Sequence, residues 1–253
     1  MSRRATKPVG NWLLDALPER DFESLARNLT PISFDLNEVI YEPGEQIDVC
    51  YFPTTCHISL LYTTIDGVTT EMGVVGHEGV VGTALFMGGD TSPNQAVVQG
   101  AGQALSLRAH AMHREFGRGG EFQTLLLRYT QSLITQISQT AVCNRMHTVE
   151  QRLCRSLLMT RDRTLTDELQ MTQEFLSNKL GVRREGVTHA ARDLQERRLI
   201  SYVRGKIKIL DRSKLERCSC ECYKVVQEES QRLRFLASQT SFSRNAQFSL
   251  VKP

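Results

Sequence analysis

Residues 171–199 read MTQEFLSNKLGVRREGVTHAARDLQERRL, and the spacing of their apolar residues predicts two short helices joined by a turn. Thr172 can cap the first helix, and Gly181 can adopt the left-handed conformation that ends it. The inward positions around the turn are small or apolar: Leu176, Ser177, Leu180, Val182, Val187 and Ala190. The pattern is typical of a helix-turn-helix whose second helix, from about Arg183 to Arg197, fits a DNA major groove.

The outward face of the predicted second helix is polar. Spacings of i, i+1, i+4, i+5 and i+8 place five side chains on it: Arg184, Glu185, Thr188, His189 and Arg192. Arginine can donate two hydrogen bonds to guanine, glutamate can accept one from cytosine, and threonine can contact a base or a phosphate. An ordinary helical hairpin with a solvated charged face is the alternative. Residues 201–203 and 207–210 then alternate around a basic tip at 204–206, which predicts a two-stranded wing.

Residues 172–210 resemble the winged helix of the Crp/Fnr superfamily of bacterial transcription regulators. The segment GVRREGV at residues 181–187 is similar to the family's G-x-S-R-E-x-V. The resemblance implies that Arg184 and Glu185 contact bases, and that Arg183 and Thr172 contact phosphates. Arg183 replaces a frequent serine, and His189 stands where cyclic-AMP-responsive members have a further base-reading arginine. The operator sequence therefore does not follow, and His189 can make one hydrogen bond to a base or none.

Short alternating apolar runs between residues 39 and 107 are separated by turn residues, and nine of the seventeen glycines lie between 67 and 102. This texture predicts a β-roll or jelly roll. Residues with helical spacing precede it and would cover one end: Trp12, Leu13, Leu14, Phe22, Leu25, Ala26 and Leu29. The order of elements, with the turn at residues 42–45, resembles the Crp/Fnr effector domain, so the resemblance covers residues 11–215. The expected fold is α+β, with a cyclic-nucleotide-binding-like roll before the winged helix.

A bound cyclic nucleotide needs backbone amides near a glycine-rich turn and a countercharge for its phosphate. In the family's cyclic-AMP binders, a Gly-Glu pair, an Arg-Ser or Arg-Thr pair and a helical Thr-Ser pair provide the contacts. The corresponding candidate effector residues here are Glu78, Gly79, Val80, Gly82, Asn94, Gln95 and Ser138. They include no arginine. We therefore expect an unknown small-molecule effector, or none, rather than cyclic AMP.

A cupin-type metal enzyme is a different function for a jelly roll, and it needs three or four converging ligands. The candidates are His57 and His77 with Glu71 or Glu78, which lack a close His-x-His pair. No Ser-His-Asp or paired-carboxylate arrangement stands out either. We expect no catalytic residues, no enzymatic activity and no cofactor.

Residues 121–147 contain no proline or glycine and predict a long helix. Its predicted stripe has spacings of three, four and seven: Leu126, Leu133, Ile137, Thr140 or Ala141, and Asn144. The stripe can cover the β-roll, and the family resemblance implies that the helix also pairs with its copy. Thr148 and Gln151 then predict a capping box for the next helix.

The predicted domains are a β-roll with capping helices at 1–120, a dimerisation helix at 121–147 and a winged helix-turn-helix at 148–217. Residues 218–253 form a last unit, with a helix from Tyr223 to about Ala237 and a frayed polar tail at 238–253. The net charge is −5 over residues 1–149, +6 over 150–217 and +2 over 218–253. Positive charge thus gathers on the predicted DNA-binding unit.

The start of the chain lacks an apolar run long enough for a signal peptide, and no stretch approaches a membrane span. We expect a cytoplasmic protein with no membrane partner. The seven scattered cysteines predict reduced, mostly buried thiols. Cys218, Cys220 and Cys222 are closely spaced, but C-x-C-x-C lacks the usual zinc spacing. No metal site is assigned. For these three cysteines, metal binding, redox sensing and the absence of both functions remain alternatives.

The sequence predicts a homodimeric, sequence-specific transcription regulator that binds a double-stranded DNA operator, with RNA polymerase as an expected partner. The alternative is a small-molecule or redox- or metal-sensing module whose winged helix contacts protein rather than DNA.

Overall fold

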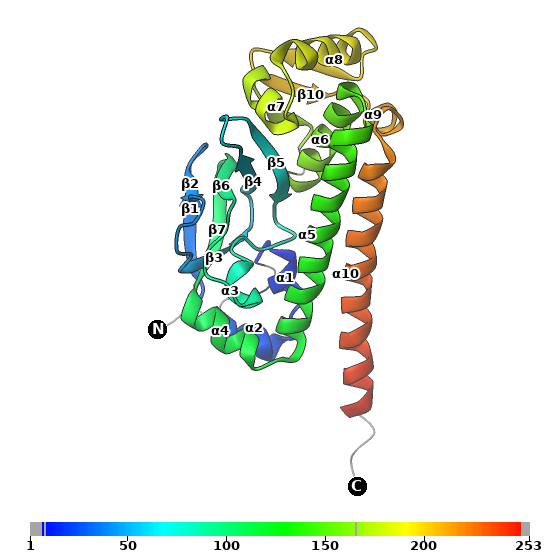
Figure 1. Ribbon diagram of the computed structural model, residues 1–253. Helices are drawn as coiled ribbons and strands as arrows, with labels where there is room; N and C mark the ends of the chain where they lie inside the picture. Colours follow the sequence, from blue (N-terminus) through cyan, green and yellow to red (C-terminus); the bar gives the residue numbers. More distant parts are fainter. Residues whose placement is uncertain (1–6, 8, 165, 249–253) are drawn as a thin grey trace.

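Two antiparallel sheets share one core in the N-terminal half of the computed structural model, which describes residues 7, 9–164 and 166–248 (Figure 1). One sheet has the order β1 (Thr30–Phe34), β7 (Gly102–Arg108), β3 (Val49–Pro53). The other has the order β2 (Val39–Tyr41), β6 (Gln95–Gly100), β4 (His57–Thr63), β5 (Thr69–Val75). Phe52 and Leu107 from the first sheet meet Ile58 and Val98 from the second in this core. The predicted β-roll is confirmed.

Four short helices close the roll: α1 (Trp12–Asp15), α2 (Glu19–Ala26), α3 (Ala84–Met87) and α4 (Ala109–Gly117). Leu13 and Leu14 of α1 and Phe22 of α2 are buried, as their spacing predicts. Asn11 fixes the first helix, because its amide donates to the carbonyls of Pro53 and Gly79 at 2.8 and 2.9 Å. Of these helices, α2 and α4 lie at the end of the roll away from the winged domain (Figure 1).

The long helix α5 (Gly120–Met146) runs along the roll, as predicted. Leu126, Leu133 and Thr140 are buried, and the Gln136 side chain bonds both the N–H and the C=O of Val74, at 3.0 and 3.2 Å. The prediction was wrong for Asn144, which is exposed. Asn144 lies instead at the rim of a small cavity that Glu71 and Gly73 of β5 also line.

The C-terminal helix α10 (Glu221–Phe248) lies antiparallel to α5 (Figure 1). The predictions of a helix end near Ala237 and a frayed segment from Ser238 were wrong, because the helix continues to Phe248. Residues 249–253 lie outside the described residues. A polar composition does not end a helix without a breaker, and residues 221–248 contain neither proline nor glycine. Gln131 of α5 donates to Glu229 of α10 at 3.0 Å.

The winged domain consists of α6 (Val149–Thr164), β8 (Glu168–Gln170), α7 (Gln173–Leu180), α8 (Arg184–Glu196), β9 (Ile200–Val203), β10 (Lys206–Ile209) and α9 (Arg212–Cys218). Thr148 and Gln151 form the predicted capping box before α6. The wing contains a third strand that was not predicted, because β8 pairs with β10 in the order β8-β10-β9. Its tip, Arg204-Gly205, has positive φ at both residues, as a two-residue type I′ hairpin requires.

Two ion pairs join the winged domain to the roll. Lys179 of α7 reaches Glu71 of β5 at 2.6 Å, and Arg163 of α6 reaches Glu78 at 2.7 Å. All four side chains are at most 13% exposed, so these contacts are shielded from water. Among the helices that the structure describes, none combines the length and the apolar character needed to cross a bilayer.

Candidate nucleic-acid interface

Helix α8 has one buried face and one exposed face. Val187, Ala190, Ala191 and Leu194 are buried against the winged-domain core. Four of the predicted contact residues are exposed on the other face, and Thr188 is partly exposed: Arg184, Glu185, Thr188, His189 and Arg192. The 3.6-residue period places them there, and the structure brings all five to one surface.

The start of α8 lies beside the start of α7, and three of the predicted residues lie at these two helix starts. Thr172 caps α7 through an N–H···O bond of 3.1 Å from Phe175, while Arg183 is the N-cap residue of α8. Arg184 donates from Nε to the Gln173 side chain at 3.3 Å. Gln173 thus steadies the guanidinium and leaves its terminal nitrogens for other acceptors. Sequence reasoning missed Gln173, although it directly follows the predicted cap.

Two shallow clefts separate α8 from the wing. One of about 300 Å³ is lined by Thr172, Gln173, Arg184, Tyr202, Arg204 and Gly205. The other, of about 400 Å³, is lined by residues of α8 with Gln173 and Tyr202. Tyr202 donates to the Met171 carbonyl at 2.9 Å, and burial raises the pKa of its phenol. Tyr202 was predicted only as a strand residue, and its place between wing and helix required the tertiary structure.

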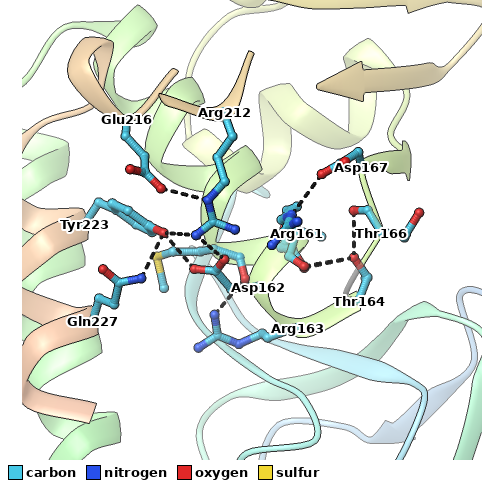
Figure 2. Close-up of polar contacts among 12 residues, drawn as sticks. Arg161, Asp162, Arg163, Thr164, Thr166, Asp167, Arg212, Glu216, Tyr223 and Gln227 are labelled. Atoms are coloured by element: carbon cyan, nitrogen blue, oxygen red, sulfur yellow. Dashed lines mark hydrogen bonds and ion pairs between the residues drawn. The ribbon is translucent and has the colours of Figure 1, made fainter. Parts of the chain in front are cut away.

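Some cations of the basic segment 150–217 have acidic partners, and others have none in the part of the chain that the structure describes. Two of the paired cations lie behind the helix-turn-helix: Arg161 pairs with Asp167 at 2.9 Å, and Arg212 pairs with Asp162 at 2.9 Å and Glu216 at 2.8 Å (Figure 2). On the face of α8 and the wing tip, a second group forms no ion pair among the described residues: Arg183, Arg184, Arg192, Arg204 and Lys206. The predicted contact surface therefore carries five cations without an acidic partner, and Arg152, Arg155, Arg198 and Arg217 also form no ion pair among the described residues.

Several of the candidate effector residues are in contact with other parts of the chain. Glu78 points to α6: burial would raise the pKa of its carboxyl, but the Arg163 guanidinium lowers it on balance. Gly79 is covered by the Tyr129 ring, which an added Cβ would meet at 2.2 Å. On the other side of the roll, Gln95 donates to Glu42 at 2.8 Å.

The remaining candidate effector residues lie in the roll and on α5. Val80 and Gly82 are buried in the roll, where Gly82 has a φ of +93° and lies against Cys50. Asn94 is half-buried and its N–H donates to the Ser92 hydroxyl at 3.2 Å. Ser138 is exposed on α5.

The candidate ligands of a cupin-type centre are engaged elsewhere. His57 is buried against Gly100, and burial lowers the pKa of its imidazole to about 3. Glu71 is paired with Lys179 and Glu78 with Arg163, both from the winged domain. His77 lies beside the Arg163 carbonyl at 3.3 Å.

The structure separates the three tail cysteines. Cys218 is half-buried and lies 3.6 Å from an Arg197 nitrogen. Cys220 and Cys222 point instead toward α5, where they meet Cys143. All seven cysteines are free thiols and six are buried, as predicted.

Comparisons with known proteins match both halves of the chain. The family described as cyclic nucleotide-binding domain matches residues 31–118, and the Crp-like helix-turn-helix domain matches residues 151–218, together more than half of the chain. No curated protein sequence matches.

Solved structures with the same fold include the following three proteins. FixK2 from Bradyrhizobium japonicum is 16% identical, with 76% of this chain and 98% of that chain covered and a TM-score of 0.66. The c-di-GMP-responsive global regulator CLP from Xanthomonas campestris is 14% identical, with coverages of 77% and 100% and a TM-score of 0.65. A transcriptional regulator of the CRP family from Thermus thermophilus, TTHB099, is 20% identical, with coverages of 74% and 95% and a TM-score of 0.62.

Proposed function

Because this chain belongs to the Crp/Fnr superfamily of transcription regulators, we propose that it binds a two-fold DNA operator as a homodimer, without cyclic AMP as its effector. The observation that carries the proposal is the group of cations on α8 and the wing that has no acidic partner among the described residues. Such a surface attracts phosphates, and its exposed Arg and Glu side chains can read base edges. RNA polymerase is the expected partner at the promoter.

Arg184 is the main base-reading residue in this proposal. Its guanidinium is exposed, and the bond to Gln173 orients it from one edge. Glu185, Thr188, His189 and Arg192 extend the same face along the groove. Arg183 and Thr172, at the ends of the two helices, contact phosphates instead.

The homodimer is proposed from a second stripe on α5, which faces away from the roll. Leu127 and Ile134 are seven residues apart and 52% and 55% exposed, and Val142 follows at 46%. Apolar residues with this spacing are typical of a helix that packs against a parallel copy. A second copy of α5 is therefore the proposed occupant of this stripe, and its two-fold axis would place two α8 helices in successive major grooves.

The effector proposal follows from the charges in the roll. A buried phosphodiester requires a countercharge, and Asn94 and Gln95 supply none. Arg163 is committed to Glu78 at 2.7 Å. We propose that the roll either takes a ligand other than cyclic AMP or serves as a fixed support for α5.

Operator selection from genomic DNA, followed by footprinting, tests the main proposal. The protected site should have two half-sites whose centres lie about 10 bp, or a small multiple of that, apart. Arg184→Ala should cost about 1–3 kcal/mol on the operator and little on random DNA. Arg183→Ala should weaken both and make the salt dependence shallower by about one unit of slope.

A matched control is Arg20→Ala, which removes an exposed arginine of α2 far from the winged domain. It should change neither affinity. Equal losses for Arg183→Ala and Arg184→Ala on both DNAs would refute the assignment of base and phosphate contacts. A monomer bound to one asymmetric half-site would refute the dimer.

A further inference from the structure

Four side chains with metal-binding atoms converge where the end of α5 meets the start of α10. They are Cys143, His147, Cys220 and Cys222, and their donor atoms all lie within 4.8 Å of one another. The three thiols are buried and form their own cluster, while His147 is the C-cap of α5. We propose that this Cys₃His cluster is a structural zinc site.

The spacing of the donor atoms fits a tetrahedral ion. With Zn–S bonds of about 2.3 Å and a Zn–N bond of about 2.0–2.1 Å, tetrahedral angles place two sulfurs about 3.8 Å apart and a sulfur and nitrogen about 3.6 Å apart. Cys143 Sγ and Cys220 Sγ are 3.4 Å apart, and Cys222 Sγ and His147 Nδ1 are 3.7 Å apart. Small side-chain adjustments therefore suffice to bind the ion.

The imidazole is oriented as in other zinc sites. His147 directs Nδ1 toward Cys222, and its Nε2 lies 3.2 Å from a carboxylate oxygen of Glu221. A carboxylate that accepts from one ring nitrogen leaves the lone pair of the other nitrogen for a metal. Glu221 thus acts as a positioning residue for His147. This contact is a second feature of the cluster that thiol packing alone does not explain.

Zinc accounts for the donor set better than a disulfide does. A disulfide between Cys143 and Cys220 would use two of the four donors and leave Cys222 and the oriented imidazole unused. Three thiolates and one imidazole complete a tetrahedral shell with no open position, which is typical of structural rather than catalytic zinc. Cys218 lies outside the cluster, so only two of the three tail cysteines are ligands.

The place of the cluster gives the ion a mechanical role. His147 is the last residue before the capping box of α6, so it lies at the joint between the long helix and the winged domain. Cys220 and Cys222 bracket the start of α10. One ion would fix this joint to α10, and hence the winged domain to the helix proposed to form the dimer.

Metal analysis of the full chain, purified under reducing conditions and dialysed against metal-free buffer, tests the site. Elemental mass spectrometry should find about one zinc ion per chain. Cys222→Ser and His147→Asn should each lose most of this zinc, whereas the matched control Cys218→Ser should keep it. Cobalt substitution gives an independent readout, because tetrahedral Co²⁺–thiolate absorption should be present in the wild type and in Cys218→Ser but lost in Cys222→Ser.

Glu221→Gln tests the positioning residue without removing a ligand. Competition with a chromophoric chelator should show zinc affinity reduced by about 10–100-fold. Circular dichroism on each variant separates lost metal from lost fold, and a folded Cys222→Ser without zinc supports the proposal. A wild type that takes up no zinc, a Cys143–Cys220 disulfide in protein isolated from cells without added reductant, or iron in place of zinc would each overturn it.

Discussion

The buried ion pair between Lys179 of α7 and Glu71 of β5 should hold the winged domain on the β-roll, and removing the cation should be costly. The Nζ and Oε2 atoms are 2.6 Å apart, and the side chains are only 3% and 11% exposed. Ser59 donates to the same carboxylate oxygen. Burial lowers the pKa of Lys179 although Glu71 opposes this, so the charge of one partner depends on the other.

The magnitude follows from two opposing terms. At 2.6 Å the attraction is about 6 kcal/mol for an effective dielectric constant of about 20, and desolvation of the two ions offsets several kcal/mol of it. The net contribution of the intact pair is therefore small. Lys179→Met has a different effect, because it leaves the Glu71 carboxylate buried with only Ser59 as partner. It should lower the free energy of unfolding by about 3–5 kcal/mol.

Urea denaturation followed by circular dichroism measures this change, and a double-mutant cycle assigns it to the pair. Glu71→Gln keeps an acceptor for Ser59, so Lys179→Met/Glu71→Gln should recover about 2–3 kcal/mol relative to additivity. The control Lys208→Met removes an exposed pair with Glu168 and should cost under about 1 kcal/mol. If Lys179→Met costs no more than Lys208→Met, the two domains are not docked in solution as described.

Three further outcomes are expected. Leu127→Ser/Ile134→Ser should convert the dimer to monomer in sedimentation experiments without loss of helicity. The control Leu36→Ser, which removes a comparably exposed leucine of the roll, should leave the dimer intact. An unchanged dimer in the double variant would count against the α5 stripe. The buried His57 has a pKa lowered from 6.5 to about 3, so the unfolded state binds its proton at a higher pH than the folded state does. The free energy of unfolding should therefore fall as pH decreases from about 6.5 to about 3, by up to about 1.4 kcal/mol per pH unit. His57→Gln should lack this part of the pH dependence. Cyclic AMP, cyclic GMP and cyclic di-GMP should be compared by calorimetry and operator binding; a tenfold gain with cyclic AMP or cyclic GMP, about 1.4 kcal/mol, would contradict the argument from the missing countercharge.

The helix-turn-helix was predictable because its determinants are local. Thr172 and Gly181 fix the ends of α7, and a 3.6-residue period sorts the faces of α8 within thirteen residues. The same approach failed for β1, where Pro31 weakens the strand pattern; the strand is possible because it lies at the edge of its sheet. It also failed for β8, a three-residue edge strand that is defined by its pairing with β10. Hydrophobic periodicity identifies the buried and exposed faces of an element. It does not identify short strands that are defined only by their pairing with a neighbouring strand.

The ion pairs between the domains were out of reach for a different reason. Lys179 and Glu71 are 108 residues apart, and each belongs to a segment whose own pattern suggested another role. Glu71 and Glu78 were considered as ligands within the roll, but both face cations of the winged domain. The sequence does not show which charged residues pair across the two docked domains. Metal-ligand candidates chosen from one domain alone therefore include carboxylates that are already paired with cations of the other domain.

The cysteine cluster lies between these two cases. Cys143 and His147 are four residues apart at the end of a predicted helix, a spacing that puts both on one face, and C-x-C provides a second pair of donors. Each half is too small to hold a tetrahedral ion, so neither pattern alone predicts a site. The missing step was the antiparallel packing of α10 on α5, which brings Cys220 to 3.4 Å from Cys143. The local pattern of α10 does not show which helix it packs against, and the donor set is complete only with α10 lying along α5.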